Sequence, residues 1–213
     1  NSTGANNFAG GQGALFANTT ADNNTAVGYL ALNANSTGAD NTGCGKSALA
    51  VNTTGGQNVA VGAGALDANT TASNNVGIGV SALGSNTTAS DNTAVGRSAL
   101  SANTTGANST AVGANALFAN TTANNNTAIG SSALQSNTTG SENTAVGEEA
   151  LSLNVTDDAN TAVGFRCLES SNGGSSNTAV GARCAEDITT GNNNVAMGYN
   201  ALHNTTTGSS NVA

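Results

Sequence analysis

Asparagine side chains supply the most frequent candidate chemistry of this chain, because they recur with a hydroxyl residue two positions later. The triplet N-x-[ST] is the acceptor sequence for N-linked glycans. The ten candidate glycosylation acceptors, spaced by 17 residues, are Asn1, Asn18, Asn35, Asn52, Asn69, Asn86, Asn103, Asn120, Asn137 and Asn154. The same triplet also suits turns and side-chain ladders, so two interpretations stay open: a stripe of glycans along one edge, or structural asparagines that happen to spell an acceptor.

Cysteine is the second residue type with covalent chemistry. Cys167 and Cys184 lie 17 residues apart. If repeat units stack, their Cα atoms would lie about 5 Å apart, within disulfide reach, although stacked free thiols are an equal alternative. Cys44 stands where most other units have valine or isoleucine, so we expect it to be a buried small hydrophobe.

Residues for catalysis are missing. The only histidine, His203, lies near the end of the chain, which argues against Ser-His-Asp or Cys-His catalysis and favours an exposed turn histidine. Gly45-Lys46-Ser47 resembles the close of a phosphate-binding loop, but Asp40 stands where that loop requires glycine. The densest acidic cluster, without calcium-specific spacing, comprises Glu148, Glu149, Asp157 and Asp158. We therefore predict no enzyme activity, no cofactor and no metal site.

An exact repeat must position these residues. A glycine falls at every seventeenth position: Gly11, Gly28, Gly45, Gly62, Gly79, Gly96, Gly113, Gly130, Gly147, Gly164, Gly181 and Gly198. The consensus around it is N-T-A-V-G-x-x-A-L-x-x-N-T-T-G-x-x, and no insertion interrupts it. Residues at the same repeat position are called a column below. The period predicts one repeat domain covering residues 1–213.

Residue types choose strand over helix. Gly, Asn, Thr, Ser and Val dominate the unit, and Gly and Asn keep fixed places as turn residues do. We predict an all-β fold: a parallel β-solenoid, or β-roll, of about 12.5 coils with two short strands per 17-residue coil, stacked roughly 4.8 Å apart.

Facing rules then assign the apolar columns. Neighbouring strand residues point to opposite faces, so Ala94 and Val95 cannot both face the coil interior, and the same holds for Ala99 and Leu100. We expect the Val and Leu columns to fill the interior and the Ala columns to point outward against another chain. The alternative is that a turn at the glycine brings all four columns inward.

A further asparagine column precedes the T-A-V-G segment, running from Asn7 through Asn92 to Asn211 with Ser109 as its one exception. We predict that it is structural, with buried amides that bond the backbone of their own coil and the copy in the next.

The recurring N-[ST]-x-A-[VI]-G element, seen as Asn108–Gly113 and Asn125–Gly130, resembles the head repeat of YadA-like trimeric autotransporter adhesins, also found in fibre-like proteins of phages and other viruses. The similarity covers all 213 residues, although the 17-residue unit is longer than that family's usual head repeat. The resemblance implies a left-handed parallel β-roll, three chains around an axis, and an extracellular fibre.

The net charge of the chain limits the classes of partner that it can bind. Twelve acidic and four basic residues give a net charge of −8, which disfavours nucleic acid and anionic membranes. No apolar stretch is long enough for a membrane span, so we predict no membrane insertion. The expected partners are copies of the same chain, joined head-to-tail or laterally, together with host-surface or carbohydrate ligands.

We therefore predict a structural or adhesive subunit of an extracellular fibre or filament, located outside the cell or on a cell or virion surface. It would assemble through open solenoid ends and the small outward apolar columns. One alternative is a receptor-binding segment of a phage or viral tail fibre. Another is an ice-binding solenoid, for which the hydroxyl array would be Thr20, Thr37, Thr54, Thr71, Thr88, Thr105, Thr122 and Thr139.

Overall fold

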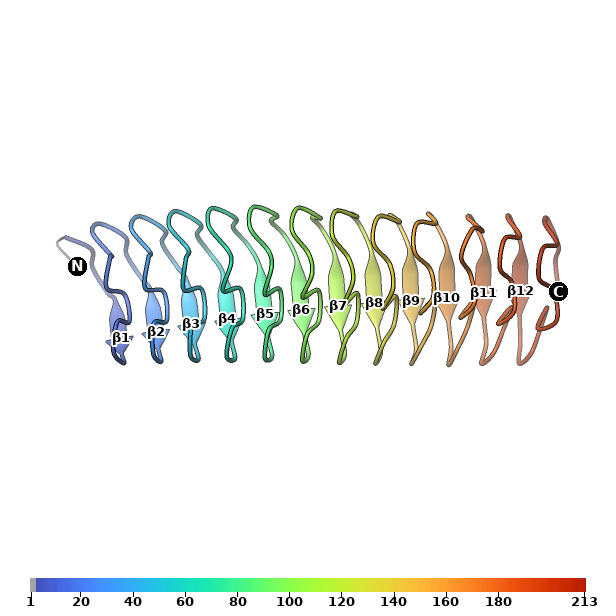
Figure 1. Cartoon of the computed structure of the whole chain (residues 1–213), viewed down its shortest axis with the longest axis horizontal. Helices are drawn as coiled ribbons and strands as arrows, with labels where there is room; N and C mark the ends of the chain where they lie inside the picture. Colours follow the sequence, from blue (N-terminus) through green and yellow to red (C-terminus); the bar gives the residue numbers. More distant parts are fainter. Residues whose placement is uncertain (1–2) are drawn as a thin grey trace. The chain divides into compact units, whose positions relative to one another are not determined.

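The computed structural model describes residues 3–213, so Asn1, a candidate glycan acceptor, lies outside the described residues. The chain divides into two compact units, Asn1–Asn108 and Ser109–Ala213, and each is built of coils that contain one short strand (Figure 1). The first unit contains β1 (Phe8–Gly10), β2 (Thr25–Val27), β3 (Thr42–Cys44), β4 (Val59–Val61), β5 (Val76–Ile78) and β6 (Thr93–Val95). The second contains β7 (Thr110–Val112), β8 (Thr127–Ile129), β9 (Thr144–Val146), β10 (Thr161–Val163), β11 (Thr178–Val180) and β12 (Val195–Met197).

Strands pair in parallel with the copy one repeat away. Between β2 and β3 the partners are Thr25 with Thr42, Ala26 with Gly43 and Val27 with Cys44. The other strand pairs within each unit keep the same offset, for example Thr144 with Thr161 between β9 and β10. Because every column stacks on itself, the predicted all-β parallel solenoid with a 17-residue repeat is confirmed.

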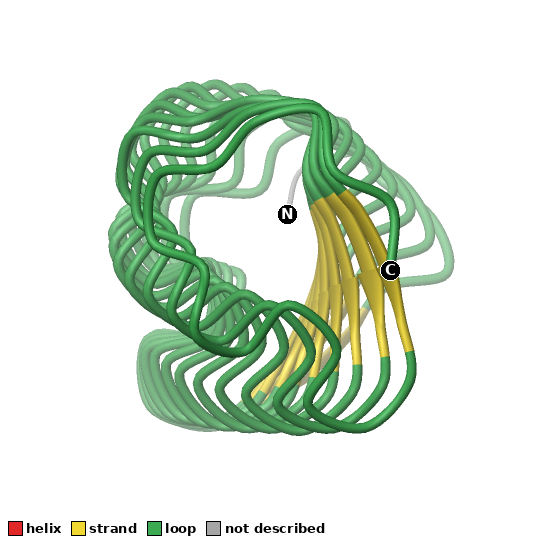
Figure 2. Ribbon diagram, turned by 90° about the vertical axis from the view of Figure 1, so that its right-hand side faces the viewer, coloured by secondary structure: helices red, strands yellow, loops and turns green. Residues whose placement is uncertain are grey.

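Each coil holds one strand of three residues among the described residues, so the prediction of two strands per coil was wrong. Figure 2 shows the strands along one side of the coils and loops around the rest. The reason lies in the backbone of the Ala-Leu segment. Leu66 has a φ of 51° and Ser81 a φ of 56°, and both values belong to the left-handed region, which an extended strand does not contain.

The facing of the Ala and Val columns is the reverse of our expectation. Ala94 is completely buried, whereas Val27 is 39% exposed and Ile129 41% exposed. The cause is a narrow interior at the middle of the strand. A Cβ added at Gly43 would lie 3.2 Å from the Ala48 carbonyl oxygen across the coil and 3.3 Å from Leu32 Cγ, so only a very small side chain fits there.

The Leu column does fill the interior as predicted, but the alanine before it is buried too. Ala99 and Leu100 both have no exposed surface. Alternation fails at this pair because Leu100, with a φ of 51°, turns the chain, so that both side chains point inward. Three of the four apolar columns therefore face inward, and only the Val/Ile column faces out.

The repeat glycine is required by a close approach between coils. Gly62 has a φ of 133°, and a Cβ added there would lie 2.5 Å from the carbonyl oxygen of Gly79 in the next coil. No side chain fits in that space, which explains why the column accepts glycine alone.

Candidate functional surface

The candidate glycan acceptors from Asn18 to Asn154 line the coil interior. From Asn35 to Asn154 their side chains have no exposed surface, and Asn18 is 2% exposed. The Nδ2 atom of Asn52, to which a glycan would be attached, donates to Asn35 Oδ1 at 2.9 Å and to the Gly55 carbonyl oxygen at 2.8 Å. The acceptor nitrogens are thus used within the fold, which favours the structural interpretation of these triplets.

The asparagine ladder has a defined end in the second unit. Asn154 donates to Asn137 Oδ1 at 2.9 Å, but its own Oδ1 is buried without a hydrogen-bond partner. The next residue in the column is Ser171, whose hydroxyl donates to the Gly174 carbonyl oxygen at 3.3 Å instead. A hydroxyl is too short to replace the amide, so the ladder stops here.

The other asparagine column is also structural, as predicted. Asn24 Oδ1 accepts the backbone N–H of Asn41 at 2.9 Å, and Asn24 Nδ2 donates to the Gly38 carbonyl oxygen at 2.9 Å. Both bonds join neighbouring coils. Buried amides therefore stabilise the stack through two separate ladders.

The outward side of the strands forms a regular surface without charged side chains. It consists of the first and third residues of each strand, here called the outward strand face, and none of these residues is ionisable except Cys44. In the first unit Val27, Val61 and Ile78 are 37–39% exposed. In the second, Ile129 is 41% and Met197 is 69% exposed. Each unit therefore presents an apolar column to solvent.

Threonine hydroxyls flank this column. In the second unit the first strand residue is threonine in five consecutive strands: Thr110, Thr127, Thr144, Thr161 and Thr178. The separate column predicted as a hydroxyl array, which includes Thr54 and Thr139, is exposed. The residue before Thr54 is hydrogen-bonded to the next coil, since Thr53 Oγ1 donates to the Thr70 carbonyl oxygen at 3.0 Å.

All three cysteines are free thiols, and their exposure is opposite to our expectation. Cys44 lies on the outward strand face and is exposed, because it replaces an outward Val. Cys167 and Cys184 replace inward alanines and are completely buried. Burial, with a contribution from Cys184, raises the pKa of Cys167 to about 12. A disulfide between the buried pair stays a prediction.

The acidic cluster that the sequence singled out is divided among separate contacts. Glu149 pairs with Arg166, and Glu148 is exposed. Asp157 is only 7% exposed, and its Oδ2 accepts the backbone N–H groups of Gly173 and Gly174. These contacts give Asp157 a structural role in the next coil.

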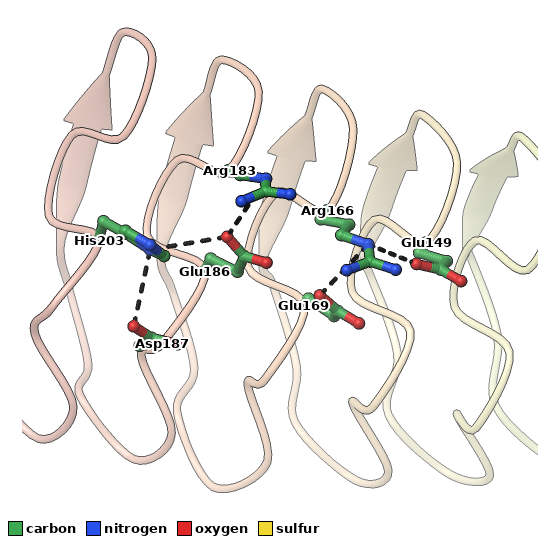
Figure 3. A network of polar contacts seen from close by, with 7 residues as sticks. All are labelled: Glu149, Arg166, Glu169, Arg183, Glu186, Asp187 and His203. Carbon is green, nitrogen blue, oxygen red and sulfur yellow. Dashed lines mark hydrogen bonds and ion pairs between the residues drawn. The ribbon is translucent and has the colours of Figure 1, made fainter.

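Charged side chains gather in the last coils of the second unit (Figure 3). Arg166 Nε lies 2.7 Å from Glu149 Oε2 and 3.8 Å from Glu169 Oε2. His203 is not in an exposed turn by itself: its Nδ1 lies 3.6 Å from Glu186 Oε2 and 3.6 Å from Asp187 Oδ2. Arg166 and Glu169 lie in the same coil, whereas the other three pairs link successive coils. Partly exposed pairs of this kind contribute little to stability.

No group of three or more His, Cys, Asp or Glu side chains in residues 3–213 is arranged to hold a metal ion. Within the same range there is no helix long and apolar enough to cross a membrane.

Comparison with models of known protein families, with curated proteins and with solved structures finds no match. The resemblance to YadA-like head repeats therefore stays a prediction. The sequence reasoning missed the outward Val/Ile column, because strand alternation does not tell which of two neighbouring apolar residues faces inward.

Proposed function

We propose that this protein is a structural or adhesive subunit of an extracellular fibre, in which copies of the chain associate laterally through the outward strand face. The observation that supports the proposal is the outward Val/Ile column, whose side chains are exposed or half-buried and run in register on parallel strands in each unit. This column takes the place of the alanine columns that the sequence suggested as the contact.

A second copy of the same chain is the partner that fits this face best. Stacked coils space the Val/Ile side chains evenly, at about 4.8 Å. Only a surface with the same spacing can meet every side chain of the column, and a copy of this chain offers that spacing by construction. The face also lacks charged residues, so a net charge of −8 does not act directly across the contact.

Sedimentation measurements on the whole chain test the proposal. We expect the native protein to form oligomers at micromolar concentration. Ile129→Lys places a charge within the column and should shift the protein toward monomer, while its fold survives because the side chain is 41% exposed. Phe118→Lys is the matched control, since Phe118 is 42% exposed but lies in a loop. A native chain that stays monomeric at high concentration would refute lateral association.

Cys44 provides a second test without any substitution. It lies in β3 on the proposed contact, and the other two thiols are buried. Mild oxidation should join two copies through Cys44 if their outward strand faces meet in register. Cross-linking that persists equally when oligomers are first dissociated by dilution would indicate random collision rather than a specific contact.

Ice binding is the second candidate, and the threonines of β7–β11 favour it. Their hydroxyls share one face with the Val/Ile methyl groups, in a T-x-[VI] pattern repeated along the ladder. Thermal hysteresis and recrystallisation inhibition, measured on the Phe118→Lys and Ile129→Lys chains, distinguish the two functions. Activity in the first that is lost in the second would support ice binding over fibre assembly.

A further inference from the structure

The first unit has a surface hollow of about 320 Å³ that interrupts the regular repeat. It lies beside the segments that follow the repeat glycines of three successive coils. Lys46 and Ser47 line it on one coil, and Val80 and Ser81 line it on another. Ala63 and Gly64 line it on the coil between these two. Its size is at the lower end of small-molecule binding sites.

The hollow exists because Gly64 has no side chain, although its place in the coil does not require glycine. The same position is serine at Ser47, Ser81, Ser98 and Ser132, with φ values of 56–58°, against 66° at Gly64. A Cβ added at Gly64 would meet only Ser81 Oγ at 3.7 Å and Asp67 Oδ2 at 3.8 Å, which are ordinary contacts.

Gly13 shows that absence of a side chain at this position does not by itself leave open space. A Cβ added there would lie 2.7 Å from Leu30 Cδ2 and 3.2 Å from Asn33 Nδ2, so neighbouring side chains already occupy the space. At Gly64 no neighbour does so. The opening is therefore particular to this coil and is not a general consequence of the repeat.

Asp67 lies at the side of the hollow, and its carboxylate accepts hydrogen bonds at a repeat position where another coil has a hydrogen-bond donor. Asn33 has the same repeat position, and its Nδ2 donates to the Gly13 carbonyl oxygen at 2.8 Å. An ionised carboxylate cannot make that bond. Burial raises the pKa of Asp67, opposed by hydrogen bonds from the backbone amides of Asp67 and Ala68. Asp67 lines the hollow, and its Oδ2 would lie 3.8 Å from a Cβ added at Gly64.

The other groups around the hollow narrow the chemistry of a ligand. The Lys46 ammonium and the Ser47 and Ser81 hydroxyls can donate hydrogen bonds, and Val80, which is 53% exposed, offers methyl groups. The Asp67 carboxylate repels anions. A single carboxylate is also too few ligands for a metal ion, in agreement with the lack of any metal-binding cluster in the described residues.

We propose that this hollow binds one sugar residue, with two adjacent hydroxyls donating to the Asp67 carboxylate, Lys46 and the serines bonding the ring substituents, and Val80 packing against the C–H groups of the ring. The inference deepens the adhesive function proposed above, because it assigns a site for a carbohydrate. It does not depend on how copies of the chain associate.

Titration of the isotope-labelled whole chain with glucose, galactose, mannose and N-acetylglucosamine, followed by NMR, tests the proposal. We expect at least one sugar to bind with a dissociation constant on the order of 1 mM, as befits a small open site. Shifts should be confined to amides near Lys46, Gly64, Asp67 and Ser81. Absence of localised shifts with all four sugars at tenfold that concentration would overturn it.

Gly64→Ser is the decisive variant, because it restores the residue of neighbouring coils and places a side chain in the hollow without a clash at Cβ. It should weaken binding at least tenfold while leaving the urea midpoint and the sedimentation behaviour unchanged. Ser132→Gly is the matched control: it removes the side chain at the same repeat position in the second unit, where Gln135 replaces the carboxylate. It should create no binding. Sugar binding that survives Gly64→Ser would refute the site, whereas a change only in sedimentation would bear on fibre assembly instead.

Discussion

Replacing Asn52 by alanine tests whether the buried asparagines hold the coils together. Asn52 donates to Asn35 Oδ1 at 2.9 Å and to the Gly55 carbonyl oxygen at 2.8 Å, and it accepts from Asn69 Nδ2 at 2.9 Å. Gly55 keeps a second donor, Asn41 Nδ2, and Asn69 keeps the Ala72 carbonyl oxygen, but Asn35 Oδ1 is left buried and unpaired. One orphaned acceptor, two further lost bonds and a small cavity together lower the free energy of unfolding by about 3–5 kcal/mol.

The matched control is Thr54→Ala, which also destroys the N-x-[ST] triplet but leaves the ladder intact. Thr54 is exposed, so the substitution should change the free energy of unfolding by less than about 0.5 kcal/mol. Urea unfolding followed by far-ultraviolet circular dichroism measures both variants, with equal m-values as a check on comparable unfolding. If Asn52→Ala costs within about 1 kcal/mol of Thr54→Ala, the ladder does not stabilise the coil as argued.

Three further results are expected from the same protein. One thiol in the native chain, that of Cys44, should react with Ellman's reagent, and all three after unfolding in guanidinium; three fast thiols in the native state would contradict the inward facing of the other two. Asp157→Ala leaves two backbone amides of the next coil without their acceptor and should lower the free energy of unfolding by about 2–4 kcal/mol, whereas Glu148→Ala should be near neutral by urea titration. Burial raises the pKa of Glu169 above its ordinary value of 4.5, so the folded state binds this proton more tightly and stability falls as pH rises through the window just above 4.5. Urea midpoints from pH 4 to 7 should lose part of that slope in Glu169→Gln, and an unchanged slope would count against it.

The period and the parallel, in-register stacking could be predicted from the sequence because both follow from an unbroken column of glycines. The structural role of Asn24 and its equivalents could be predicted for the same reason: an amide repeated at every coil has a matching partner in the next. These inferences need only the repeat length and the hydrogen-bonding capacity of each residue type.

The facing of Ala94 and Val95 could not be predicted, because alternation says that one of them points inward but not which. Interior width decides it, and that width depends on where the opposite segment passes, as the close contact of position 43 with Ala48 and Leu32 shows. Alternation also failed at Ala99 and Leu100, since nothing in the residue type of leucine signals a positive φ.

The hollow beside Asp67 could not be predicted from the sequence either. In the sequence Gly64 is one more variable position of the repeat. Only the structure shows that neighbouring side chains occupy the space beside Gly13 but not the space beside Gly64. A residue that departs from the repeat consensus can be interpreted only when the side chains around it are known.

The coil-to-coil bonds have a consequence for how such a gene can change. The strand pairs and the asparagine ladder connect residues 17 positions apart, so excising residues 52–68 would join Val51 to Asn69, which has the same repeat position as Asn52. Replication slippage by one whole unit therefore lengthens or shortens the protein by one coil, and the new junction joins the same repeat positions as every other junction in the chain. Slippage by anything other than whole units would leave one coil with a different length, so that the columns on its two sides would no longer be in register.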